Sequence, residues 1–292
     1  MQNQSAFKYF ATALLLLLAP ACNRSVVIQG TVTDIQGEEL PGVAITITGA
    51  PYETLSNVLG KYTLRCAPGN IEMIFLKSGF TPGVLRVEAQ QRDALAVKEM
   101  VLWPLPPRPG VYAFKNFRYE ETTRIEPKRY KVKSGGQVFA TKKAPDLLIG
   151  EAQPQLIAYK LPPFDAQIYR LEQVPARQPE ATGETYPETV WAPVESVPVL
   201  STPIDEPERL LLELQVSRPL ESGAYAVHWG ALDGYRMSGA EGYRANESLI
   251  YLFRVVDPEE EAKIRAEAQA EAEAETVQRR EKAESTTAEE EE

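Results

Sequence analysis

The amino-acid sequence predicts a mainly β protein with two β-sandwich domains and a solvent-exposed C-terminal helix. Short segments rich in β-branched and aromatic residues alternate with Gly, Pro and Asn turns through residues 24–256. A proline run at 104–109 divides this region in two, and the residues after 256 are almost all Ala, Glu, Gln, Lys and Arg. Apolar residues make up 43% of the 292 positions, so the chain can build a real core.

Residues 1–21 have the features of an export signal. Lys8 supplies a positive charge, and the apolar run Tyr9–Leu18 is too short to span a bilayer. Small residues then lead directly to Cys22. This pattern resembles a bacterial lipoprotein signal, although the family usually has Leu where Ala19 stands. The resemblance implies an exported protein that is anchored to the outer membrane through a lipid on Cys22, on its periplasmic or outer face. The alternative is an ordinary secretory signal, which leaves Cys22 free to pair with Cys66.

The first domain, residues 22–103, begins with four clear strand patterns. We expect strands at 26–34, 43–49, 61–65 and 71–75, each bounded by a turn that contains Gly, Pro or Asn. In the second of these, Val43, Ile45 and Ile47 alternate with smaller or polar residues and so share one face. Strands of this length with regular turns indicate an antiparallel sandwich.

Glycines and alternating apolar residues recur in a fixed order through this domain. The residues are Gly30, Val32, Asp34, Gly37, Leu40, Pro41, Gly42, Val43, Ile45, Ile47, Gly49, Thr54, Asn57, Gly60, Tyr62, Pro68, Gly69, Lys77, Gly79 and Phe80. In this order they resemble the carboxypeptidase regulatory-like domain. The resemblance implies a seven-stranded, transthyretin-like sandwich of the carbohydrate-binding-like group, and it implies no catalytic residues.

A second β-rich, sandwich-like domain is expected at 110–256, after a proline linker at 104–109 that should act as a semi-rigid spacer. Strand patterns recur up to residue 255, the last of them at 249–255. Between about 173 and 208 the chain carries seven prolines and almost no alternation, which predicts a long loop. Trp191 lies in this segment, where it either contacts a sugar or a protein partner or pins the loop to the sandwich.

Positive and negative charges are unevenly distributed along the sequence of the second domain. Residues 108–143 hold ten Lys and Arg against three Glu, a net charge of +7, whereas residues 144–256 hold sixteen acids against eight bases, a net charge of −8. The basic residues Lys128, Arg129, Lys131 and Lys133 either occupy the solvent face of a strand or face anionic lipid headgroups. Because the protein is expected to be exported, we expect no nucleic-acid partner.

One His and two Cys in the whole chain exclude most catalytic and metal chemistry. A catalytic triad could use only His228, and a Cys/His zinc site lacks ligands. We therefore expect that the protein is not an enzyme and that it binds neither a cofactor nor a metal. The function expected is a non-catalytic, lipid-anchored envelope protein that binds an unidentified envelope protein or glycan. The alternative is a carbohydrate-binding accessory protein, in which Trp191 or Trp229 contributes to a binding surface.

The tail, residues 257–292, has the composition of a solvated helix followed by a disordered end. Asp257 and Pro258 are typical of a helix start, and three Glu follow them. No apolar stripe is present, so we expect the helix to be exposed rather than packed as a core element. The tail carries fourteen acids and five bases, a net charge of −9, and the rest of the chain is therefore close to neutral.

Overall fold

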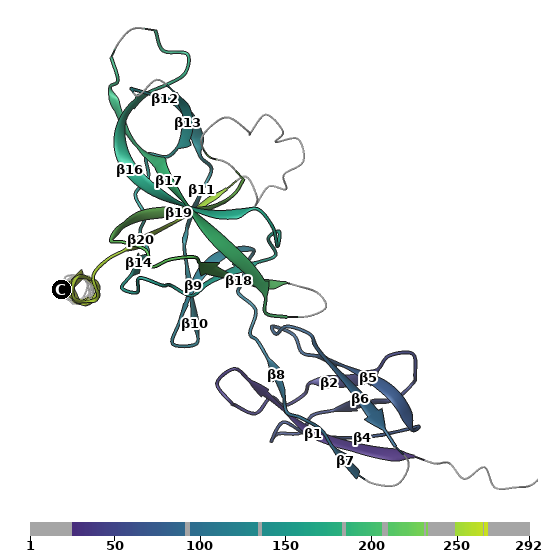
Figure 1. Ribbon diagram of the computed structural model, residues 1–292. Coiled ribbons are helices and arrows are strands. Elements are labelled where there is room, and N and C mark those ends of the chain that lie inside the picture. Colours follow the sequence, from purple (N-terminus) through teal and green to yellow (C-terminus); the bar gives the residue numbers. More distant parts are fainter. Residues whose placement is uncertain are drawn as a thin grey trace, which may run out of the picture. The chain divides into compact units, whose positions relative to one another are not determined.

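A computed structural model describes residues 25–90, 94–133, 136–182, 185–205, 210–230, 232, 249–264 and 266–267. The described residues are mainly β, with 57% of them in strands and 4% in helix, so the predicted fold class is confirmed. It forms two compact units. Unit 1 comprises Met1–Ser78 and Pro82–Leu102, and unit 2 comprises Gly79–Thr81 and Trp103–Glu292. Figure 1 shows both, coloured along the sequence.

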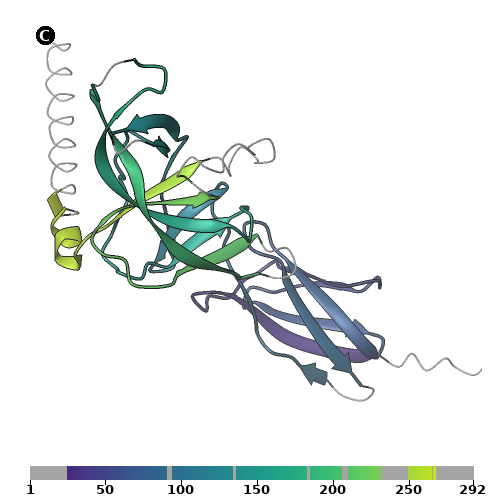
Figure 2. The same ribbon diagram turned by 45° about the horizontal axis from the view of Figure 1, so that its top comes forward.

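Unit 1 contains two small sheets. The first holds β4 (Lys61–Cys66), β1 (Val26–Asp34), β7 (Ala94–Ala96) and β8 (Met100–Leu102). The second has the order β3 (Glu53–Leu55), β2 (Ala44–Ile47), β5 (Gly69–Leu76) and β6 (Gly83–Ala89). Strands β7 and β8 pair in turn with residues 27–29 and 32–34 of β1, so together they occupy one interrupted edge position. The unit therefore has seven strand positions, and its strands lie along a similar axis, most neighbours being antiparallel (Figure 2).

The core of unit 1 follows from the alternation in the sequence. Val43, Ile45 and Ile47 are buried, as predicted, because their side chains point between the two sheets. Tyr62 and Phe75 meet edge to face across this core, with ring centroids 5.5 Å apart. Burial raises the pKa of Tyr62 to about 12.

Two turns of unit 1 depend on particular residues. The Asp34 carboxylate accepts hydrogen bonds from the backbone N–H groups of Gln36 and Glu38, at 2.8 and 2.9 Å, which closes the turn after β1. Gly60 has a φ of +65°, and a Cβ there would collide with the backbone carbonyl of Val32. Only glycine satisfies both conditions at this position.

Unit 2 contains one twelve-stranded sheet. Its main order is β10 (Arg118–Glu121), β9 (Gly110–Lys115), β15 (Leu156–Tyr159), β18 (Leu211–Val216), β17 (Glu188–Pro203), β16 (Ala166–Arg177), β19 (Gly223–Trp229), β20 (Ile250–Val255) and β11 (Thr123–Ile125). Three further strands extend it: β12 (Lys128–Val132) pairs with β13 (Gln137–Ala140) and β16, and β14 (Leu148–Ile149) pairs with β20.

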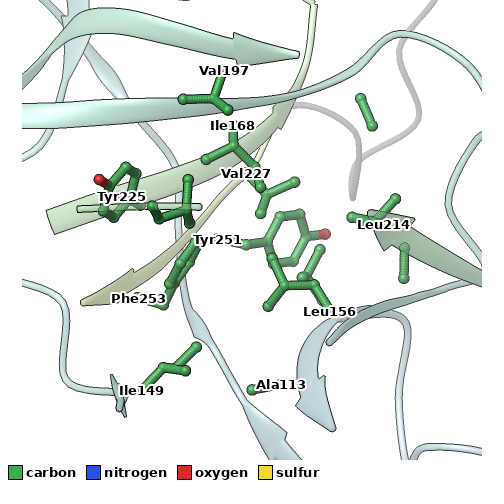
Figure 3. Close-up of a cluster of buried hydrophobic side chains, with 14 of the residues drawn as sticks. Ala113, Ile149, Leu156, Ile168, Val197, Leu214, Tyr225, Val227, Tyr251 and Phe253 are labelled. Atoms are coloured by element: carbon green, nitrogen blue, oxygen red, sulfur yellow. The ribbon is translucent and has the colours of Figure 1, made fainter. Parts of the chain in front are cut away.

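The largest apolar cluster among the described residues of unit 2 joins both halves of the sheet. Side chains from β9, β15 and β18 lie in the same cluster as side chains from β16, β19 and β20, which agrees with a sandwich (Figure 3). Tyr225 stacks on Phe253 with centroids 5.6 Å apart, and Trp229 meets Tyr251 edge to face.

The proline-rich segment differs from the expected loop. Residues 166–177 and 188–203 form the long strands β16 and β17, which pair over ten positions. The prolines of β17 fall where a strand tolerates a missing N–H. Pro193 lies beside a register shift, Pro198 lies where β17 leaves β16 for β18, and Pro203 ends the strand. The register shift also interrupts the alternation, which hides the strand in the sequence.

The β16–β17 hairpin and the β12–β13 hairpin enclose a second, smaller apolar cluster. Its buried members are Tyr130, Val132, Ala140, Ala176, Val190 and Ala192. The two hairpins are joined by the β12–β16 pairing and by a bridge between Thr141 and Trp191, and Figure 1 shows them side by side. This cluster fixes the position of β12 within unit 2.

A helix over 258–264 begins directly after the last strand, and most of its side chains are exposed, as predicted. Glu261 is the exception, because its carboxylate is buried and lies 3.2 Å from the Lys115 ammonium group. Glu261 Oε2 also fills the space beside Gly150. An ion pair, rather than an apolar stripe, therefore attaches the helix start to the sandwich. Within the described residues, the helix is neither long nor apolar enough to cross a membrane.

Candidate functional site

The basic residues of β12 divide between the two faces of the strand. Tyr130 and Val132 point into the smaller apolar cluster, so Arg129 and Lys131 point to the opposite face. The Arg129 guanidinium lies 5.4 Å from the centre of the Phe139 ring on β13. Lys133 is exposed in the turn that follows. The expectation that these charges lie on the outer face of a strand therefore agrees with the structure for Arg129 and Lys131.

Arg177 at the end of β16 joins this surface. It lies directly opposite Lys131 in the β12–β16 register, so the two side chains leave the sheet on the same face. Its guanidinium lies 5.1 Å from the centre of the Tyr186 ring. We name Arg129, Lys131 and Arg177 the basic face.

The basic face lacks acidic partners in the part of the chain that the structure describes. None of the ion pairs there involves Arg129, Lys131 or Arg177. The nearby carboxylate of Glu188 instead lies 3.2 Å from the Lys142 ammonium group. Three positive charges thus share one surface without local neutralisation, which favours contact with an anion.

Lys128 points to the other side of β12 and lines a shallow depression of about 240 Å³. The depression is lined by Ile125, Glu126, Lys128, Tyr130, Ala140, Thr141, Lys142 and Lys143. Its lysines are largely matched by acids, because Lys142 pairs with Glu188, Lys143 pairs with Asp146, and Glu126 is itself in the lining. The depression is therefore close to neutral, unlike the basic face.

Neither tryptophan that the sequence suggested as a binding residue is freely exposed. Trp191 is half-buried on β17, exchanges two backbone hydrogen bonds with Thr141, and packs against an apolar cluster that includes Tyr169 and Leu252. Trp229 is 1% exposed, and its indole N–H donates to the carbonyl of Pro162 at 2.8 Å. Both act in packing, because their rings are held against the sandwich.

His228 and Cys66 are also buried. The His228 Nδ1–H donates to the carbonyl of Leu249 at 3.2 Å, and burial lowers the pKa of the imidazole. Cys66 is a free thiol in the core of unit 1, where burial raises its pKa. Cys22, the predicted lipid attachment site, lies outside the described residues. Among those described, no group of three or more His, Cys, Asp and Glu side chains is arranged to hold a metal.

Arg177 was missed by sequence reasoning, whereas Arg129 and Lys131 were found. The basic run around β12 is visible as a cluster in the sequence, but Arg177 lies 46 positions after Lys131 and joins it only through strand pairing. A single basic residue in an apparently irregular proline-rich segment gives no signal by itself.

The comparison with solved structures gives only weak likenesses. They include a chain of a type II cohesin–X-dockerin complex from Acetivibrio cellulolyticus, with 11% identity over 27% of this chain and 58% of that chain, and a TM-score of 0.24. A streptococcal ancillary pilin has 10% identity over 81% of this chain and 62% of that chain, with a TM-score of 0.25. A candidate carbohydrate-binding protein from Bacteroides uniformis has 12% identity over 69% and 86%, with a TM-score of 0.23. No conclusion about this chain rests on scores this low.

The chain thus spans 58% of the length of the cohesin–X-dockerin chain that it matches. None of the curated proteins matches it significantly in sequence. The comparison with protein families gives one clear result, which agrees with the resemblance seen in the glycine pattern of unit 1: residues 27–101 match the carboxypeptidase regulatory-like domain.

Proposed function

We propose that this protein is a non-catalytic, lipid-anchored component of the bacterial cell envelope, and that it binds an anionic envelope partner through the basic face of unit 2. The observation that carries the binding role is the group of three unmatched cations, Arg129, Lys131 and Arg177, on a surface held by strand pairing. The matched carboxypeptidase regulatory-like domain supports a role as a binding module.

The anchor part of the proposal rests on the sequence around Cys22. An apolar run followed by small residues and a cysteine supports lipid attachment, and several acyl chains on one residue give stable membrane binding. Only three residues separate Cys22 from β1, so unit 1 would be tethered by a very short segment.

Cell fractionation tests the anchor. Cys22→Ser should move the protein from the membrane fraction to the soluble envelope fraction, because it removes the acylated thiol. Cys66→Ala is the matched control, since it removes a buried thiol and should leave the protein in the membrane fraction. Unchanged membrane partitioning of Cys22→Ser would contradict the anchor.

Rebinding to isolated envelopes tests the basic face. The full chain with Cys22→Ser should bind envelopes at low salt and dissociate as salt rises, because exposed charges are screened. Adding Arg129→Gln and Lys131→Gln should weaken this binding roughly tenfold. The control adds Lys61→Gln and Arg65→Gln, an equal change of charge at exposed positions of β4. Equal losses in both variants would mean that only net charge matters and would remove the basic face from the proposal.

A further inference from the structure

Lys131 and Arg177 are an unfavourable pair as the chain stands. Residues directly opposite in an antiparallel pair have their Cβ atoms about 5 Å apart, and like charges at such positions destabilise the pairing. Strands β12 and β16 pair over only two positions, and one of the two carries this repulsion. The other position joins Val132 to Ala176, both of which are buried.

The Arg177 guanidinium is also incompletely satisfied. Its Nε and Nη1 atoms are shielded from solvent and have no hydrogen-bond acceptor. A buried donor without a partner destabilises the folded state, and more so when it is charged. The side chain as a whole is only half-buried, so a ligand can approach it from the solvent side. The Tyr186 ring lies against the guanidinium and helps to hold it in place.

An anion between Lys131 and Arg177 would relieve the repulsion between the two cations. The Nη2 group of Arg177 is not among the shielded atoms and can donate to an oxygen of a phosphate or carboxylate, and the Lys131 ammonium group adds a mobile point charge. Arg129 lies on the same face of β12 and adds a third positive charge. Because none of these three cations has an ion-pair partner among the described residues, a group with more than one negative charge fits better than a single carboxylate.

We propose that Lys131 and Arg177 bind a phosphate group carried by an envelope component. The phosphate would accept hydrogen bonds from the Arg177 guanidinium and the Lys131 ammonium group, and Arg129 would attract it electrostatically. This proposal rests on the proposed function in one respect, since it specifies the partner chemistry of the basic face. A phosphorylated saccharide and a phospholipid headgroup present the same group, so the probes must separate them.

Thermal melting of the full chain in detergent tests the site with inorganic phosphate, a hexosamine phosphate and glycerol 3-phosphate. Chloride at equal ionic strength is the reference. A phosphate concentration a hundred times Kd should raise the Tm of unit 2 by roughly 5–10 °C. A stronger effect of the hexosamine phosphate indicates a glycan source, and a stronger effect of glycerol 3-phosphate indicates a lipid source. If none of the three phosphates raises the Tm above the chloride reference, the site does not bind phosphate and the proposal is wrong.

Three variants assign the effect to the site. Arg177→Gln should abolish the rise in Tm, and Lys131→Gln should raise Kd about tenfold. Arg118→Gln, an exposed arginine on β10, should behave as wild type. In chloride alone, Arg177→Gln should melt no lower than wild type, because it removes an unpaired cation; a clearly lower Tm would instead mean that Arg177 is structural. If Arg177→Gln does not fold, Lys131→Gln carries the test.

The two proposals can fail separately. If phosphate raises the Tm but the protein does not rebind to envelopes, the proposed function is contradicted and the phosphate site is not. Rebinding that depends on the basic face, with no phosphate effect on Tm, would contradict the phosphate site alone.

Discussion

At the scale of single residues, the turns of unit 1 depend on particular side chains and glycines. The Asp34 carboxylate closes one turn through two backbone N–H groups, so it has a structural role rather than an acid–base role. At Gly60 the backbone is left-handed and also lies against the carbonyl of Val32. At Gly37 the backbone is equally left-handed, but nothing lies within 4 Å of the place where a Cβ would stand.

These two glycines separate backbone strain from steric conflict. Gly37→Ala should lower the free energy of unfolding of unit 1 by about 1–2 kcal/mol, from the left-handed conformation alone. Gly60→Ala should lower it by clearly more, because the strand carrying Val32 must also shift. Chemical denaturation followed by the fluorescence of Tyr62 measures the free energy of unfolding of both variants. Equal losses of stability in the two variants would show that the contact with the Val32 carbonyl adds nothing to the destabilisation caused by Gly60→Ala.

At the scale of elements, the C-terminal helix is attached by charge. Lys115 on β9 lies between Glu151 and Glu261; burial opposes its charge, but its hydrogen bonds to these two carboxylates prevail and raise the pKa of Lys115. The Glu261 carboxylate fits only because Gly150 has no side chain. The sequence predicted an exposed helix from the lack of an apolar stripe, and that reasoning cannot find attachment through one carboxylate.

Gly150→Ala should therefore detach the helix start. The added methyl group would occupy the position of Glu261 Oε2, so amide exchange over 258–264 should become much faster. The sheet beside it should remain intact, because Arg254 and Val256 keep their backbone hydrogen bonds to Leu147 and Ile149. Gly136→Ala, where a Cβ meets nothing within 4 Å, is the control. Unchanged exchange in Gly150→Ala would contradict this account of the attachment.

The long strands were the main element that the sequence concealed. In unit 1, alternation and turn residues identify β1, β2, β4 and β5, because each strand has one buried and one exposed face. In unit 2, prolines and a register shift obscure β16 and β17. The same strands supply Arg177, so the site could be predicted only as far as β12. Cross-strand neighbours depend on register, which local patterns do not contain.

At the scale of the whole molecule, burial of the one histidine links stability to pH. His228 is buried in β19 of unit 2, and burial lowers the pKa of its imidazole below the ordinary 6.5, despite the hydrogen bond to Leu249. The unfolded chain therefore binds this proton more readily than the folded chain. The contribution of neutral His228 to the stability of the folded state is therefore fully present above pH 6.5 and is lost as the pH falls below that value.

The Tm of unit 2 should thus fall between pH 7 and pH 5 by more in wild type than in His228→Gln. The slope due to this residue is at most about 1.4 kcal/mol per pH unit. Melting curves recorded by near-UV circular dichroism at several pH values give the difference. Parallel curves for the two proteins would show that His228 does not control this response.

The strand order of unit 2 also has a consequence for the time course of folding. Strands β16 and β17 are neighbours in the chain, and Ala176 pairs with Glu188 only 12 positions later. Strands β11 and β20 join Thr123 to Leu252, which are 129 positions apart. Closing a long loop costs more entropy before any contact rewards it, so the hairpin that carries Arg177 can form early, whereas the β11–β20 edge can form only when nearly the whole domain is available.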